Sequence, residues 1–162
     1  MDTGEKRLQF LLSFMETNGI GKNELARVMG VSAQNIFPYF KRDDMKLSYA
    51  QEIFNKYGYD LSFALEKEQQ STSSVIIDIQ PLVSPGGLKR LAFLRVAFAL
   101  YGINRKSLSD DLGLNITGVN RWFRVDDIAI SYIFEIAELY GLKVRITATP
   151  KNKATHCVTS FL

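Results

Sequence analysis

Few residues of this sequence have the types and spacing that catalysis or metal binding would require. The chain of 162 residues has one cysteine, Cys157, and one histidine, His156. A lone histidine cannot build a multi-histidine metal site, and a lone cysteine cannot form an internal disulfide. Asp110 and Asp111 are adjacent carboxylates, but neighbouring helix positions point about 100° apart, so they make a poor acid–base pair. The sequence therefore predicts a protein that is not an enzyme and that needs no metal or cofactor.

Composition indicates an ordinary soluble protein, with 46% hydrophobic and 23% charged residues. Its uncharged stretches are shorter than the roughly 20 apolar residues that span a bilayer. The first ten residues, MDTGEKRLQF, carry both signs of charge, unlike a secretory signal. We therefore expect a cytoplasmic protein with no membrane association.

The net charge of +3 is unevenly distributed along the chain. Residues 1–70 have a balance of −1, and residues 90–162 have a balance of +4. The C-terminal half is thus the better candidate for contact with a polyanion, although an ordinary solvated surface would carry the same modest charge.

The main signal in the sequence is an internal repeat with a constant offset of 83 positions. Residues 7–58 and 90–141 align without a gap and share 17 identities in 52 positions, whereas chance would give about three at typical residue usage. The chain is therefore predicted to contain two copies of one module. The predicted domains are a first module over 1–80, a linker over 81–87 and a second module over 88–162.

Apolar spacing predicts four helices in each copy. The second helices should cover 22–29 and 105–112, each ended by a glycine, Gly30 or Gly113. Polar N-caps should open the third helices at Ser32 and Asn115. The fourth helices should begin at Ser48, with a capping box completed by Gln51, and at Ser131.

Each copy should end in a short β-hairpin. The predicted first strands are 59–66 and 142–149, and a second β-rich run follows each of them, at 75–79 and at 157–162. An isolated hairpin is only marginally stable in water, so the strands of both copies are predicted to share one small sheet. The predicted fold class is mainly α, with two four-helix modules and attached hairpins.

The segment ELARVMGVSAQNIFPYF at 24–40 resembles the helix-turn-helix of lambda-repressor-like or Cro-like regulators. Small Ala26, turn residue Gly30 and apolar Val31 and Ile36 carry the resemblance. The second copy, SLSDDLGLNITGVNRWF at 107–123, matches with Ser109, Gly113, Leu114 and Val119. With the first and fourth helices, the similarity covers about 52 residues per copy, and the hairpins fall outside it.

The resemblance implies a sequence-specific, repressor-like transcriptional regulator of a bacterium, phage or mobile element. Its partner would be double-stranded DNA, and it would be associated with the nucleoid in the cytoplasm. The third helix would enter a major groove about 12 Å wide, where Gln or Asn suits adenine, Arg suits guanine and an apolar group suits a thymine methyl. The implied base contacts are Ser32, Ala33, Gln34, Asn35 and Phe37, and Asn115, Ile116, Thr117, Asn120 and Arg121. The implied contacts to the DNA backbone are Lys22, Lys41, Arg42, Arg105, Lys106 and Arg124.

Structural roles compete with several of these assignments. Ser32 and Asn115 also suit helix capping, and Phe37 also suits packing against a neighbour. The aromatic residues at the end of each third helix are expected in the core: Tyr39, Phe40, Trp122 and Phe123.

Three features depart from the family pattern. Pro38 should kink or end the first copy's third helix, Gly118 weakens its counterpart by about 1 kcal/mol, and Asp110 and Asp111 bring negative charge near the DNA backbone. Two alternatives therefore stay open: both copies bind DNA, or one of them keeps only the fold. A protein-interaction module without DNA binding is the alternative function, and a further homodimer is compatible with the sequence.

Overall fold

The computed structural model describes residues 6–67, 89–151 and 159–161, which form eight helices and three strands. The prediction of a mainly helical protein is confirmed. No described helix has both the length and the apolar character needed to cross a membrane. The elements of residues 6–67, called here the first half, are α1 (Gln9–Thr17), α2 (Lys22–Met29), α3 (Ala33–Arg42), α4 (Leu47–Lys56) and β1 (Tyr59–Lys67). Those of residues 89–151, the second half, are α5 (Ala92–Tyr101), α6 (Arg105–Leu112), α7 (Ile116–Val125), α8 (Ile130–Tyr140) and β2 (Leu142–Pro150), and β3 (Thr159–Phe161) follows.

Turn residues end the helices largely where the sequence predicts. Gly30 and Gly113 have φ values of +70° and +66°, and they end α2 and α6 in the left-handed conformation that glycine adopts at low cost. The predicted capping box at the start of α4 is wrong. Ser48 bonds to Asp127 and the Gln51 amide donates to the Leu61 carbonyl, so neither side chain caps α4 itself.

The strands form one antiparallel sheet in the order β1-β2-β3. Strand β1 pairs with β2 along all nine residues, so the strands of the two halves do share a sheet. The central pair is Phe63 with Ile146, two residues that are 83 positions apart. Strand β3 pairs with residues 146–148, as the second predicted hairpin requires. The predicted strand at 75–79 lies outside the described residues.

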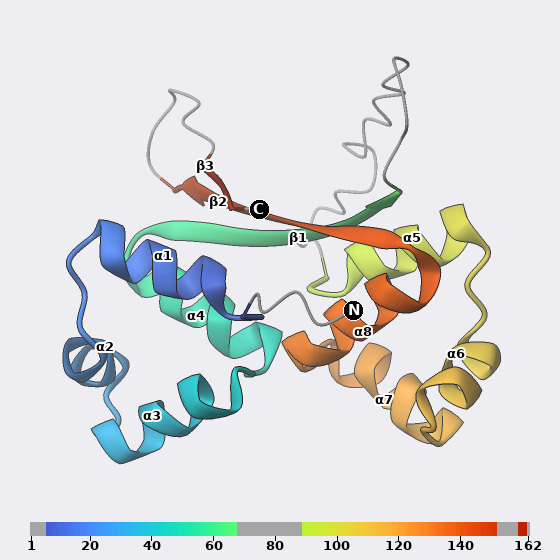
Figure 1. Ribbon diagram of the computed structural model, residues 1–162, viewed down its shortest axis with the longest axis horizontal. Coiled ribbons are helices and arrows are strands. Elements are labelled where there is room, and N and C mark those ends of the chain that lie inside the picture. Colours follow the sequence, from blue (N-terminus) through green and yellow to red (C-terminus); the bar gives the residue numbers. More distant parts are fainter. Residues whose placement is uncertain (1–5, 68–88, 152–158, 162) are drawn as a thin grey trace.

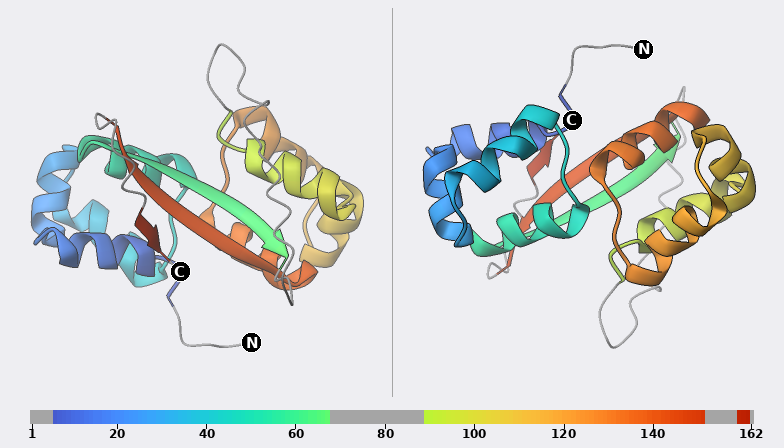
Figure 2. Two further views of the ribbon diagram at one scale, coloured as in Figure 1. Left: turned by 90° about the horizontal axis from the view of Figure 1, so that it is seen from above. Right: turned by 90° about the horizontal axis from the view of Figure 1, so that it is seen from below.

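The sheet runs along one side of the molecule, and the helices lie beneath it in two groups (Figure 1). Helices α1–α4 cover one end of the sheet and α5–α8 cover the other, as the view from above also shows (Figure 2). The sheet buries alternate side chains against these helices, as expected for strands with one covered face. Phe63 contacts an aromatic ring of each half, Phe10 at 5.6 Å and Phe93 at 6.2 Å between ring centroids. One apolar core therefore continues through both halves.

Below the sheet, the two halves meet through the loops that precede α4 and α8. The Leu47 amide donates to the Ile128 carbonyl at 2.8 Å, and the Ile130 amide donates to the Met45 carbonyl at 2.9 Å. Lys46 and Ala129 form the bridge between these bonds. Leu47 and Ile130 are equivalent positions of the repeat, as are Met45 and Ile128. The two hydrogen bonds are therefore equivalent, and the contact is reciprocal.

Two aspartates fix the ends of the helices near this contact. The Asp44 carboxylate accepts the backbone N–H of Ser131, in the first turn of α8, at 2.9 Å. In return, Asp127 accepts the backbone N–H of Ser48, in the first turn of α4, at 3.0 Å. A carboxylate at a helix N-terminus satisfies a free N–H and complements the helix dipole. Each half thus caps a helix of the other half.

Within each half, a neighbouring aspartate joins the end of the third helix to the start of the first. Asp43 has a φ of +54°, and its carboxylate accepts the backbone N–H groups of Arg7 and Leu8 at 2.7 and 3.0 Å. The Arg7 Nε donates back to the Asp43 carbonyl at 2.9 Å. Asp126 likewise accepts the backbone N–H groups of Arg90 and Leu91, and the Arg90 Nη1 donates to the Asp126 carbonyl at 2.8 Å. These bonds fix the position of α3 and α7 within their halves.

Candidate nucleic-acid interface

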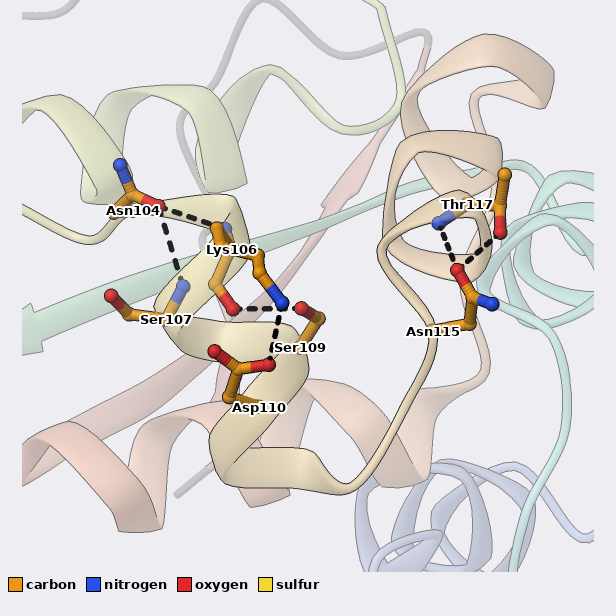
Figure 3. Close-up of polar contacts among 7 residues, drawn as sticks. All are labelled: Asn104, Lys106, Ser107, Ser109, Asp110, Asn115 and Thr117. Atoms are coloured by element: carbon orange, nitrogen blue, oxygen red, sulfur yellow. Dashed lines mark hydrogen bonds and ion pairs between the residues drawn. The ribbon is translucent and has the colours of Figure 1, made fainter.

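Small residues allow the second and third helices of each half to cross closely. Ala26 and Ser109 are almost fully buried at these crossings, at 2% and 0% exposure. The Ser109 hydroxyl donates to the Lys106 carbonyl at 2.7 Å, so its burial leaves no unpaired polar group (Figure 3). Ile36 and Val119 are fully buried on the inner faces of α3 and α7. Helices α2 and α3, and likewise α6 and α7, therefore form helix–turn–helix segments.

Helix α3 exposes most of the residues for which the sequence implies base contacts. Ser32, Gln34, Asn35 and Phe37 are exposed, and Ala33 is half-buried. Phe37 is 45% exposed, which is high for a large apolar side chain. Ser32 occupies the N-cap position, but its side chain makes no capping hydrogen bond, so the capping prediction is wrong here.

In helix α7 the corresponding polar side chains already make hydrogen bonds. The Asn115 Oδ1 accepts the Thr117 backbone N–H at 3.0 Å and also the Thr117 hydroxyl, so the capping prediction is confirmed here (Figure 3). The Asn120 Oδ1 accepts from Arg105 at 3.2 Å. Arg121 is exposed and Ile116 is half-buried.

The aromatic residues in the last turns of α3 and α7 differ in burial between the halves. Trp122 and Phe123 are buried, as predicted, at 8% and 6% exposure. Tyr39 and Phe40 are only half-buried and lie at the margin of the core, so the prediction that they are core residues is too strong. One residue of each pair packs against a tyrosine of the fourth helix in its half: Tyr39 lies 4.9 Å from Tyr49, and Trp122 lies 5.0 Å from Tyr132, between ring centroids.

Pro38 does not end α3, which continues to Arg42. The prediction that Pro38 ends the helix is therefore wrong. Pro38 is exposed, so its ring meets solvent. The buried Ile36 and the half-buried Tyr39 and Phe40 pack α3 against the core. Proline removes one backbone donor, and side-chain packing offsets that loss.

Several implied phosphate-binding residues stack on aromatic rings. The Lys22 Nζ lies 4.9 Å from the centre of the Phe40 ring, and the Arg105 guanidinium lies 3.9 Å from that of Phe123. These two pairs occupy the same positions of the two halves. Burial lowers the pKa of Arg105, and the neighbouring charge of Arg95 lowers it further. The pair Arg42 and Tyr39 is looser, at 5.5 Å.

The other implied phosphate contacts are exposed. Lys106 pairs with Asp110 at 2.9 Å in an exposed ion pair, while Lys41 and Arg124 lie on the outer surfaces of α3 and α7. Neither α3 nor α7 contains an acidic residue, so the charges of both helices are positive. Figure 1 places both helices on the side of the molecule away from the sheet, one in each half.

Two groups of residues that position this surface are not predicted from the sequence. Asn104 caps α6 by accepting the backbone N–H groups of Lys106 and Ser107 at 2.8 and 3.3 Å (Figure 3). An asparagine directly before a predicted helix would have been a sufficient signal. Asp44 and Asp127 stand 83 positions apart, as the repeat requires, but their hydrogen bonds join the two halves, and no local pattern reveals that.

Among the described residues, no three His, Cys, Asp or Glu side chains lie close enough together to hold a metal ion. Cys157 and His156 lie outside the described residues.

Comparison with known proteins gives a similarity that covers half of the chain. The chain is 30% identical over 81 residues to the Repressor protein CI of Enterobacteria phage phi80. The similar region makes up 50% of this chain and 33% of that repressor, so the chain spans about a third of the relative's length. No family model matches the chain, and no solved structure matches it. Over half its length, then, the chain is similar to a phage repressor.

Proposed function

We propose that the protein is a sequence-specific DNA-binding transcriptional regulator of the repressor type, and that its two halves are copies of one helix-turn-helix module. The domains would be residues 1–80 and 88–162, with 81–87 as linker. The observation that carries the proposal is the reciprocal contact between the halves, centred on Lys46 with Ala129 and on Phe63 with Ile146. Contacts that repeat in both directions are typical of two-fold dimers.

In this proposal the single chain takes the place of a dimer of repressor subunits. Helices α3 and α7 would enter major grooves about 34 Å apart on one face of the duplex, as paired recognition helices do. The cationic side chains of both helices would meet phosphates, and the exposed polar residues would read bases. The similarity to a phage repressor supports this class of function, which would place the protein in the cytoplasm, on the nucleoid.

The two reading surfaces differ, so the preferred site would be asymmetric. Helix α3 offers Gln34 and Asn35, which suit adenine, and the apolar Phe37. Helix α7 offers Asn120 and Arg121, and the latter suits guanine. Asn115 and Thr117 would have to exchange their mutual hydrogen bonds for contacts with bases.

Fluorescence anisotropy of the purified protein on random-sequence duplex, repeated over a salt series, tests DNA binding. A log–log slope of about −4 or steeper would correspond to four or more phosphates, at about 0.9 per contact. Failure to bind at low salt would contradict the proposal.

One observation favours a second function, a protein-interaction module. Phe37 and Val125 are large apolar residues on α3 and α7 that are 45% and 51% exposed. Apolar groups on a surface often mark a protein contact, although Phe37 also suits a thymine methyl. The variant Phe37→Ala separates the two functions. If Phe37 reads DNA, the variant loses affinity for duplex, whereas a protein-interaction module has no DNA affinity to lose.

A further inference from the structure

Two arginines of the second half lie against the same aromatic ring. The Arg105 guanidinium, at the start of α6, lies 3.9 Å from the centre of the Phe123 ring, and that of Arg95, in the middle of α5, lies 4.8 Å from it. Phe123 is almost fully buried on the inner side of α7 and also packs edge-on against Phe98. Both guanidinium groups therefore lie within 5 Å of the centre of one ring on α7.

This pair of cations has no carboxylate partner among the described residues. The hydrogen bond from Arg105 goes to the neutral Asn120 amide, and Arg95 is exposed. Two guanidinium groups near one ring repel each other, and this repulsion adds to the effect of burial, which is the larger cause of the lowered pKa of Arg105. An anion that binds both groups would remove this repulsion, and guanidinium groups match phosphate oxygens in geometry.

We propose that Arg95 and Arg105 together bind a phosphate of the DNA backbone, and that the second half thereby supplies more of the salt-dependent affinity than the first. The inference rests on the proposed function and adds Arg95 as a contact. Its location fits, because Arg105 begins the helix before α7, and the phosphates beside a groove lie next to a helix inserted into it.

The first half has no such pair. Its residue at the position of Arg95 is Leu12, which is uncharged, and Lys22 alone stacks on the equivalent ring of Phe40. The halves therefore differ in how they would hold the backbone, while α3 carries exposed Gln34 and Asn35 for base reading. Phosphate anchoring would come mainly from the second half.

The test compares the salt dependence of binding to random-sequence duplex in the wild type and in Arg95→Gln, Arg105→Gln and Lys143→Gln. Lys143 is the matched control, because it is an exposed cation on β2, and the sheet lies on the side of the molecule away from α7 (Figure 1). Arg95 is exposed, so its substitution should leave the fold intact, and the urea midpoint of each variant checks this. Because Arg105 packs closely on Phe123, the variant Arg105→Gln could be unstable. In that case the result for Arg95→Gln decides the test.

We expect Arg95→Gln to make the log–log slope shallower by about 0.9, which corresponds to about eightfold weaker binding at 0.1 M salt, while Lys143→Gln keeps the wild-type slope. If the wild type binds but Arg95→Gln keeps the wild-type slope, or changes it no more than Lys143→Gln does, the inference is wrong and the proposed function stands. If the wild type does not bind duplex at low salt, both are wrong.

Discussion

Asp127, in the second half of the chain, accepts hydrogen bonds from both the backbone N–H and the hydroxyl of Ser48, at the start of α4 in the first half. The equivalent residues at the offset of 83 positions are Asp44 and Ser131. They form one of these two hydrogen bonds, because Asp44 accepts the backbone N–H of Ser131 at the start of α8. Each half therefore completes a helix terminus of the other, and the positions of α3 and α7 depend on that exchange.

The exchange of caps predicts a stability cost when either aspartate is removed. Asp127→Ala should lower the free energy of unfolding by about 1–2 kcal/mol, because it leaves the first turn of α4 without an acceptor. Asp44→Ala should cost less, about 1 kcal/mol, because Asp44 accepts only one hydrogen bond from Ser131. Urea denaturation followed by circular dichroism measures both values.

Asp60→Ala is the control for these variants. Asp60 is exposed and lies 3.7 Å from Lys151 in a surface ion pair, which contributes at most about 0.5–1 kcal/mol. If Asp127→Ala were no more destabilising than Asp60→Ala, the cap between the halves would not contribute to stability.

Two glycines of the second half should respond to alanine in opposite directions. Gly118 lies inside α7 with ordinary helical φ, and an added Cβ would meet no atom within 4 Å. Gly118→Ala should therefore stabilise the protein by about 0.5–1 kcal/mol. Gly113 also has open space, but its φ is +66°, so Gly113→Ala should destabilise by about 1 kcal/mol. Thermal unfolding of the two variants side by side checks this, and equal shifts would contradict it.

The sequence predicts the helices and first strands well because their signals are local. The ends of α2 and α6 at glycines and the strands after α4 and α8 follow from apolar spacing and from residues that favour turns. The repeat at a constant offset of 83 positions strengthens these local signals, because each of them occurs twice.

The failures concern contacts between residues far apart in sequence. Ser48 and Gln51 match a capping box, yet the first bonds to Asp127 and the second to Leu61, and both partners become neighbours only in the folded chain. The prediction that Pro38 ends α3 fails because packing of α3 outweighs one lost backbone bond. Which exposed residues of α3 and α7 contact bases stays a prediction.

Ser109 should tolerate only a small side chain at the crossing of α6 and α7. Ser109→Ala removes one hydrogen bond to the Lys106 carbonyl and copies Ala26 of the first half, so it should change stability by less than about 1 kcal/mol. Ser109→Leu should destabilise by about 1–3 kcal/mol or more, because the fully buried site has no room for it. A leucine variant as stable as the alanine variant would show that the helices do not need to be close.

Base reading predicts different effects on specific and non-specific binding. On the preferred duplex, Gln34→Ala, Asn35→Ala and Arg121→Ala should each weaken binding by about 1–3 kcal/mol. On random-sequence duplex, the two uncharged substitutions should have little effect, because phosphates dominate that binding. Anisotropy titrations on both duplexes make the comparison. If none of the three substitutions changes affinity for the preferred site, base readout through these helices is wrong.

The central claim is that α3 and α7 of one chain read DNA together, as the helices of a dimer would. Selection of the preferred site from a random duplex pool, followed by footprinting, tests it most directly. The account predicts an asymmetric site with two unlike half-sites about one helical turn apart, bound by one chain. A perfect inverted repeat bound by two chains would contradict it, since that result would mean that a homodimer reads DNA through one half of each chain.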